Sequence, residues 1–313
     1  LQLKRLEREL PIFQVLGYSS AYFLKTYITN ILESGQEIFA ELETATAVSK
    51  LTKRCSYERM IYAYEERSIE RALLMNLPPQ TRSYGFAHAV MHEGHICFNT
   101  NKNLAANPPR PNIVLVTGRS TREWFLGKDF AAEAVKVMGS PRASTPAPGK
   151  KAWNPHHLKL LLMVSHAHEI FAFESLIKKN PSLLKHHQLT IRKYPYDKIQ
   201  LQTEGIERIR AFIPGVKDEG GDLLQQVAAN DVVLFAASSG GLEAIFLGDI
   251  GLYVSLDGIF KLNPLSVLGR QEAIFSTHTS LELENALKFL NSLGAEDLDK
   301  YHQNQIHAVQ GIY

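Results

Sequence analysis

The sequence predicts an α/β fold in which two doubly wound parallel sheets, one in each domain, face a cleft. Short β-branched apolar runs alternate with segments of helical period along most of the 313 residues. A stretch with four prolines, 141–155, interrupts this alternation and has no periodicity of its own. We therefore predict an N-terminal domain at 1–142, a linker at 143–157 and a C-terminal domain at 158–313.

The elements of the N-terminal half follow from hydrophobic spacing and turn residues. Apolar residues at helical spacing predict a helix from about Tyr18 to Lys53. The elements expected after it are the strands Arg59–Tyr64, Ser83–His88, Asn112–Thr117 and Ala134–Met138 and the helices Glu65–Leu74 and Thr121–Leu126. No strand is evident before Arg59, and the chain opens with Leu1 rather than Met, so we expect further residues to precede it.

The C-terminal half repeats the alternation. The strands expected there are Leu158–Ser165, Gln188–Lys193, Val232–Ala237 and Ile250–Ser255, and the helices are Glu169–Lys179, Glu204–Ala211, Asp222–Ala229, a helix carrying Leu242 to Leu247, Ser280–Leu290 and Glu296–Ala308. Strands joined through helices run parallel, so their carboxyl ends share one edge of the sheet. Residues that follow these strands are therefore the first candidates for a site.

Composition and charge exclude several classes of protein. The 34 basic and 32 acidic residues leave a net charge of +2, so no overall field marks a nucleic-acid binder, and only a local basic patch stays open. No apolar run approaches the roughly 20 residues that a membrane-spanning helix needs. The two cysteines, Cys55 and Cys97, are far apart and lack metal-ligand spacing, which is typical of a reducing cytoplasm.

A phosphate site is expected where the strand at 232–237 ends. Ser238-Ser239-Gly240-Gly241 follow this strand, and a helix begins at once. The first amides of a helix and the positive end of its dipole favour an anion such as a phosphate or diphosphate. Arg192, which closes the strand at 188–193, supplies the positive charge that this ligand needs. A serine cap with a glycine turn that binds nothing has the same sequence, and this alternative stays open.

Further polar side chains near this edge allow more than one interpretation. Glu243, four residues beyond Ser239, is placed to accept hydrogen bonds from a ribose or sugar diol, or is a solvated helix residue. His166 and His168 close the strand at 158–165, and in a loop they could converge. A metal site needs a third ligand, which the sequence does not place, so no metal is predicted.

Acid–base groups cluster in the N-terminal half. Glu66 follows one strand, Glu70 lies one helical turn later and His88 closes the next strand. A carboxylate and an imidazole that face a cleft can deprotonate an acceptor hydroxyl, which makes these residues catalytic candidates. The alternative is a surface helix on which Glu66 and Glu70 form salt bridges with Arg67 and Arg71.

On these residues the chain resembles bacterial surface-carbohydrate biosynthesis proteins, the GT-B type glycosyltransferases of lipopolysaccharide and capsule assembly. The matching segments are YEERSIERALL with Glu66 and Glu70, SYGFAH with His88, VLVTGRSTREWF with Gly118, VKVMGSPR with Arg142, LTIRKYP with Arg192, and SSGGLEAIFLG. The specific feature is their order, which extends from about Tyr57 to Pro264.

The resemblance implies two Rossmann-like domains, with a nucleotide-sugar donor in the C-terminal one and a glycan or lipid-linked glycan acceptor in the N-terminal one. It implies a cytoplasmic transferase that needs no metal or cofactor, and it leaves open peripheral association with the inner face of the cytoplasmic membrane. The donor-binding residues it implies are Ser238, Ser239, Gly240, Gly241, Glu243, Arg192, His166, Gly118 and Arg142, and the catalytic ones are Glu66, His88 and Glu70.

The identity of the donor and the reaction leave alternatives. A CMP-linked Kdo or nonulosonic acid donor fits the pair Ser238-Ser239, although Tyr194-Pro195 stands where transferases of that kind carry His-Pro. A nucleotide-sugar epimerase or a glycerophosphotransferase of similar fold would keep the phosphate site. A non-catalytic scaffold of polysaccharide assembly would keep the fold and need no acidic residue in the cleft.

Overall fold

The structure is a computed structural model that describes residues 14–15, 18–19, 36–54, 57–92, 95–98, 109–141, 154, 156–194, 199–218, 220–256, 263–268 and 271–313. Its contacts divide the chain into two compact units, Leu1–Tyr84 with Ala106–Asn112, and Gly85–Ala105 with Ile113–Tyr313. Helices and two main sheets alternate along the chain, so the predicted α/β class is confirmed. The domain limits 1–142 and 158–313 stay a prediction.

The larger sheet has six parallel strands in the order β12-β11-β10-β7-β8-β9. They are β7 (Lys159–Met163), β8 (Gln188–Arg192), β9 (Lys217–Asp218), β10 (Val232–Phe235), β11 (Ile250–Val254) and β12 (Phe275–Thr277). The chain begins in the middle of the sheet at β7, moves outward to β9 and returns to place β10 on the other side of β7. The direction of winding therefore reverses between β7 and β10, as in a doubly wound nucleotide-binding sheet.

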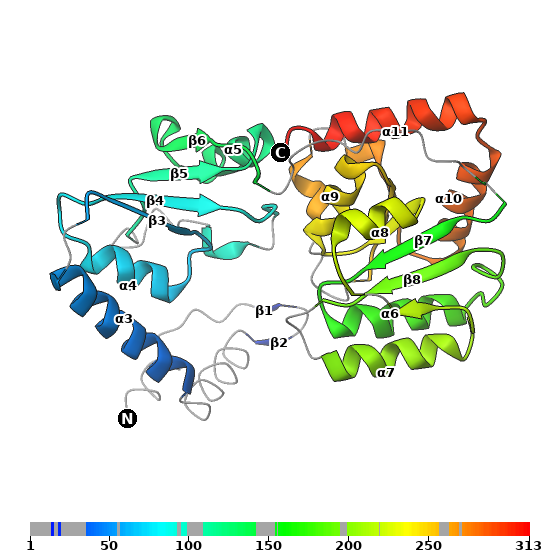
Figure 1. Cartoon of the computed structure of the whole chain (residues 1–313), viewed down its shortest axis with the longest axis horizontal. Coiled ribbons are helices and arrows are strands. Elements are labelled where there is room, and N and C mark those ends of the chain that lie inside the picture. The colour runs from blue at the N-terminus through cyan, green and yellow to red at the C-terminus, as the bar shows by residue number, and fades with distance from the viewer. Residues whose placement is uncertain are drawn as a thin grey trace. The chain divides into compact units, whose positions relative to one another are not determined.

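Helices cover both faces of this sheet (Figure 1). They are α6 (Ala167–Lys178), α7 (Ile199–Arg210), α8 (Leu223–Ala229), α9 (Ser239–Leu247), α10 (Ser280–Ser292) and α11 (Ala295–Val309), with 3-10 turns at Pro264–Val267 and Gln271–Ala273. Along β7, Leu160 and Leu162 pack in one buried cluster with residues of α6, α7 and α10. Leu161 and Met163 pack in a second cluster with residues of α8 and α9. Successive side chains of a strand point to opposite faces, so an apolar run such as β7 requires both layers.

The smaller sheet has the strand order β3-β4-β5-β6, and β5 and β6 are parallel. Its strands are β3 (Arg59–Ala63), β4 (Arg82–Ala87), β5 (Ile113–Val116) and β6 (Val135–Val137). The helical elements of this half are α3 (Gln36–Arg54), α4 (Ser68–Asn76), α5 (Arg119–Leu126) and the 3-10 turns Ile96–Phe98 and Ala132–Ala134. No helix in the described ranges combines the length and apolar character needed to cross a bilayer.

Three predicted helix starts are wrong. The helix predicted at Glu204–Ala211 is α7, which already begins at Ile199. Tyr18–Ser19 forms the short strand β2, which pairs antiparallel with β1 (Gln14–Val15), and the described helix is α3. Strands of two residues are too short to carry a periodic signal, and residues 20–35 lie outside the described ranges. The helix predicted from Glu65 begins at Ser68, because Glu66 has a left-handed backbone with φ of 59°.

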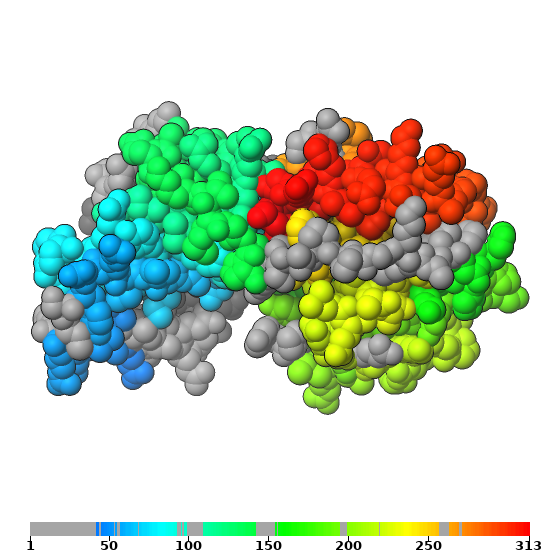
Figure 2. All heavy atoms as spheres, turned by 45° about the horizontal axis from the view of Figure 1, so that its top comes forward, coloured from blue at the N-terminus to red at the C-terminus, as the bar shows by residue number. Residues whose placement is uncertain are grey.

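The carboxyl-terminal residues pack on the start of α5, within the second compact unit. The amide of Ser120 donates a hydrogen bond to the carbonyl oxygen of Gly311 at 2.8 Å. Figures 1 and 2 show the red carboxyl-terminal end beside the green segment that contains α5. Gly118 lies so close that a Cβ atom there would clash with the backbone of Gly311 and Ile312. A glycine is therefore required for this contact.

We predict that Gly118→Ala lowers the free energy of unfolding by about 1–3 kcal/mol, as overpacking does elsewhere. The methyl group would meet backbone atoms, which cannot rotate away as a side chain can. Thermal denaturation against Gly220→Ala, where a Cβ atom would enter open space, measures the effect. Equal midpoints for the two variants would contradict the contact.

Candidate functional site

The candidate site lies at the reversal point of the larger sheet. The last residues of β7 and β10, Met163 and Phe235, are direct neighbours in the ladder. Helices α6 and α9 begin within four residues of these strand ends and pack on opposite faces of the sheet. The two connections diverge at this point, and the carboxyl edge beside such a reversal is where sheets of this type bind ligands.

A buried carboxylate joins the two diverging loops. Glu169, in the first turn of α6, has no solvent exposure. Its Oε2 accepts hydrogen bonds from the amides of Ser165, at 2.6 Å, and His166, at 3.4 Å. Its Oε1 accepts one from the amide of Ala237, at 3.4 Å, in the loop that precedes α9. Glu169 thus fixes the loop after β7 and the loop after β10 relative to one another. In the sequence, the one signal for Glu169 is its spacing from His166, which is that of a capping residue, and a role at the site does not follow from it.

The start of α9 presents hydroxyl and amide groups at this edge. Ser238 is the N-cap residue, yet its side chain makes no capping hydrogen bond, and Ser239 is the first helical residue. Both side chains are half-buried. The first amides of any helix lack an intrahelical acceptor, and the helix dipole adds a partial positive charge. The arrangement suits an anion.

The two glycines that follow are explained by close packing. A Cβ atom at Gly241 would clash with the ring of Phe235, and one at Gly240 would crowd the methyl group of Met163. The amide of Gly241 already donates to the carbonyl oxygen of Ser238, at 3.1 Å. These glycines let α9 begin directly against the ends of β10 and β7.

Arg192 brings a positive charge to the same edge. It closes β8 next to Met163, and its Nη1 donates to the carbonyl oxygen of Gly221, at 2.7 Å, and to the side chain of Gln226. Burial lowers the pKa of Arg192, while the negative charges of Asp222 and Glu243 act in the opposite direction. Glu243 of α9 therefore lies within electrostatic reach of Arg192, and a guanidinium keeps its proton at neutral pH.

The other residues predicted at this edge are His166, His168, Arg142 and the pair Tyr194-Pro195, and the structure describes only some of them. The rings of His166 and His168 stack with their centroids 5.4 Å apart, and both side chains are exposed. Among the described residues no group of three His, Cys, Asp or Glu side chains could hold a metal ion. Arg142 and Pro195 lie outside the described ranges. The backbone of Tyr194 is held by the buried Gln202, whose amide group bonds both its N–H and its C=O at 2.8 Å.

In the other compact unit, Glu66 sits in a buried polar cluster between β3 and α4. The hydroxyl group of the buried Tyr64 donates a hydrogen bond to Oε1 of Glu66. Oε2 accepts from Nε of Arg71, at 3.1 Å, and pairs with Nη2 at 3.0 Å. Burial, followed by the bond to Glu66, raises the pKa of Tyr64, so its proton stays on the phenol. The alternative interpretation placed Glu66 on an exposed helix with salt bridges. In the structure Glu66 is buried and precedes α4, although it does pair with Arg71.

Glu70 and His88 have different surroundings. Glu70 accepts hydrogen bonds from the amides of Glu65, at 2.9 Å, and Arg67, at 3.4 Å, and so caps the start of α4. Burial raises the pKa of Glu70, and these backbone bonds oppose the shift. His88 follows β4 in the second unit, half-buried, with its ring centroid 6.2 Å from that of Phe86.

No family model matches the sequence, and no curated protein matches it. Solved structures share its fold. One is Anabaena Alr3699/HepE in complex with UDP and glucose, with 14% identity, a TM-score of 0.53 and coverage of 86% of this chain and 77% of that one. Another is a putative UDP-N-acetylglucosamine 2-epimerase from Listeria monocytogenes, with 12% identity, a TM-score of 0.52 and coverage of 87% and 75%.

A third is the pneumococcal O-GlcNAc transferase GtfA in complex with UDP and GlcNAc, with 14% identity, a TM-score of 0.52 and coverage of 85% and 56%. At these identities the likeness concerns the fold. The predicted GT-B-like architecture, with its two parallel-sheet domains, is confirmed.

We predict that Glu169→Gln frees the loop before α9. An amide side chain has one acceptor oxygen instead of two, so it cannot hold both loops, and its NH₂ group would face a backbone N–H. Hydrogen exchange at the amide of Ala237 should accelerate, and stability should fall by about 1.5–3 kcal/mol, the range for hydrogen bonds to charged groups. Amide exchange measured by mass spectrometry on peptides spanning 232–238 tests this.

Glu282→Gln provides the matched control, because Glu282 accepts from the amide of His278 at the exposed start of α10 and joins no second loop. Unchanged exchange at Ala237 in Glu169→Gln would show that Glu169 does not hold the loop.

Proposed function

We propose that the protein is a glycosyltransferase that moves a sugar from a nucleotide-sugar donor to a surface-polysaccharide acceptor. One observation carries the proposal: in a GT-B fold, the reversal point of the second sheet combines the start of α9, two serine hydroxyls and the guanidinium of Arg192. The solved structures with UDP and a sugar, the HepE and GtfA complexes, support this class of donor.

Each donor group has a proposed partner. The hydroxyls of Ser238 and Ser239 and the amide of Gly240 hold the phosphates, and Arg192 neutralises their charge without a metal ion. Gly241 remains in the set for its close packing on Phe235, because its own amide already donates to the carbonyl oxygen of Ser238. Glu243 accepts hydrogen bonds from the ribose or the sugar. His166 borders the same edge, at the start of α6. Gly118 and Arg142 remain in the proposal as sequence predictions, and the packing of Gly118 on Gly311 already explains its lack of a side chain.

Glu66 is the proposed acid–base residue, with His88 and Glu70 as the other predicted members of the catalytic set. Support comes from its backbone: a non-glycine residue at φ of 59° costs about 1–3 kcal/mol, and such strain concentrates at functional sites. Tyr64 and Arg71 hold its carboxylate in one orientation. Glu70 supports the segment by binding the amides of Glu65 and Arg67.

The proposal also specifies an acceptor, a donor nucleotide and a cellular location. The acceptor is a glycan or lipid-linked glycan of lipopolysaccharide or capsule assembly, and the protein works in the cytoplasm, at the inner face of the membrane where its acceptor is lipid-linked. The donor carries UDP, as in the HepE and GtfA complexes, with a CMP-linked Kdo or nonulosonic acid as the alternative.

A nucleotide-sugar epimerase is the second candidate function, favoured by the similarity to the putative UDP-N-acetylglucosamine 2-epimerase from Listeria monocytogenes. Both candidates use the same phosphate site. They differ in the product: an epimerase releases an altered nucleotide sugar in the absence of any acceptor, whereas a transferase releases the free nucleotide only as an acceptor hydroxyl, or water in its place, takes the sugar. Nuclear magnetic resonance spectra of a donor incubated with the protein distinguish the two.

We predict that Ser239→Leu abolishes nucleotide binding, because the side chain fills the position of the phosphate and removes a hydroxyl group. In a thermal-shift screen of UDP, CMP, GDP and dTDP compounds, a ligand at 100 times its dissociation constant stabilises the wild-type fold by about 2.7 kcal/mol. Ser280→Leu changes the equivalent first residue of α10 and serves as the control. The site is refuted if no nucleotide stabilises the wild type or if Ser239→Leu binds as the wild type does.

We predict that Glu66→Gln lowers kcat by about 10²–10⁴-fold, the usual contribution of general acid–base catalysis, and leaves donor affinity unchanged. Arg71 is partly exposed, so water can solvate its charge after the substitution and the fold should persist. Steady-state kinetics with the donor found by the screen measure the effect, with Glu65→Gln as the control. A lower melting temperature with an unchanged kcat would make Glu66 a packing residue only.

A further inference from the structure

A pocket of about 560 Å³ opens at the amino-terminal edge of the larger sheet, opposite the candidate donor site. Its wall combines the residues just before β7 and β8 with the loop that follows α7. Gln188, the first residue of β8, lines this pocket, whereas Arg192, the last residue of the same strand, belongs to the donor edge. Four residue steps along a strand span about 13 Å, so the two sites are separate.

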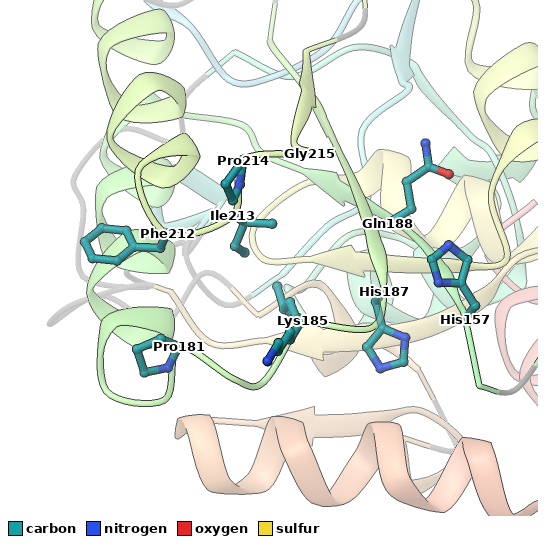
Figure 3. A pocket seen from close by; sticks show the side chains of 10 residues that line it. His157, Pro181, Lys185, His187, Gln188, Phe212, Ile213, Pro214 and Gly215 are labelled. Carbon is teal, nitrogen blue, oxygen red and sulfur yellow. The ribbon is translucent and has the colours of Figure 1, made fainter.

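The polar part of the pocket carries a positive charge. The side chain of Lys185 makes no hydrogen bond or ion pair within the described part of the chain. The residues that line the pocket include no Asp or Glu. The side chains of His157, His187 and Gln188 lie together on one side of the pocket in Figure 3, and Lys185 lies between them and the apolar side. An ammonium group in a pocket whose lining holds no carboxylate favours an anionic ligand.

The protonation state of His187 adds a fixed donor to this wall. Its Nδ1 accepts a hydrogen bond from the amide of Leu158, at 3.2 Å. Burial, followed by the charges of His157 and His186, lowers the pKa of His187, so the ring is neutral at pH 7. A neutral imidazole that accepts at Nδ1 carries its proton on Nε2, which makes this nitrogen a donor.

The other side of the pocket is apolar. Figure 3 shows Phe212, Ile213 and Pro214 there, from the loop after α7. The ring of Phe212 is 37% exposed, and the ammonium group of Lys178 stands 5.2 Å from its centroid. An exposed aromatic side chain that borders a pocket offers a stacking surface for a planar group. The pocket therefore combines an aromatic surface with several N–H donors.

We propose that this pocket binds a small soluble anion that carries an aromatic ring, of the class of aromatic phosphomonoesters. The ring lies against Phe212 and Pro214, and the phosphate oxygens accept hydrogen bonds from Nζ of Lys185, from Nε2 of His187 and from the side-chain NH₂ group of Gln188, whose backbone amide is already bonded to the carbonyl oxygen of Leu158. The volume falls in the range of about 300–1,000 Å³ that small-molecule sites occupy. The site is independent of the proposed transferase function, because it shares no residue with the donor edge.

The test uses 1-naphthyl phosphate as the probe, with isothermal titration calorimetry of the full chain. Inorganic phosphate and 1-naphthol are the two halves of the probe, and each should bind at least about tenfold more weakly than the whole, since one set of contacts is lost. Lys185→Ala and Phe212→Ala should each weaken the probe about tenfold. Lys185 and Phe212 are exposed, so these variants should fold.

Lys179→Ala is the matched control, because Lys179 is an exposed lysine at the end of α6 that does not line the pocket. Its affinity for the probe should equal that of the wild type. The proposal is overturned if neither half of the probe binds more weakly than the whole, or if Lys185→Ala and Lys179→Ala bind alike. Loss of binding in Ser239→Leu together with full binding in Lys185→Ala would place the probe at the donor edge and overturn the pocket as well.

Discussion

The buried carboxylate of Glu169 is the interaction on which the candidate site depends. The hydrogen-bonded ladder fixes β7 and β10 only as far as Met163 and Phe235, and beyond them the chain turns to opposite faces of the sheet. One oxygen of Glu169 binds the loop after β7, and the other binds the loop after β10. A fully buried carboxylate is costly to leave without donors, so the two loops can separate only at the expense of its hydrogen bonds. The loop that leads into Ser238 and Ser239 is therefore held in one position relative to β7 and β10.

The sequence predicts most of the larger sheet because its strands are apolar on both faces. Runs such as 160–163 and 232–235 admit no exposed side, which indicates helices on both sides, and the order of the segments then gives a doubly wound sheet. The strands β9 and β12 escaped prediction because they are two and three residues long and most of their side chains reach solvent. No pattern in a single sequence distinguishes such strands from loops.

The sequence predicts only those residues of the candidate site whose place depends on their immediate neighbours in the chain. Ser238, Ser239 and Arg192 stand at strand ends, and strand ends can be recognised in a sequence. The bond between Glu169 and Ala237 joins residues 68 positions apart, and the anchoring of Arg192 on Gln226 joins residues 34 apart. The left-handed backbone of Glu66, whose carboxylate binds Tyr64 and Arg71, interrupts a segment that has helical spacing from Glu65 onward. Contacts of this kind form only in the folded chain, so no periodic pattern in the sequence indicates them.

The charges around Arg192 couple two parts of the proposed donor site, the phosphate contact and the contact to the sugar. Nη1 of Arg192 is committed to Gly221 and Gln226, which fixes the plane of the guanidinium, while Glu243 supplies a nearby negative charge. A guanidinium has five N–H donors, so a phosphate can bind the remaining ones without breaking this anchor. The incoming negative charge would compete with Glu243 for Arg192 and turn the carboxylate toward other donors. Hydroxyl groups of a ribose or sugar attached to that phosphate are the nearest donors such a ligand brings, so in the proposed site binding of the phosphate and recognition of the sugar would be one coupled event at α9.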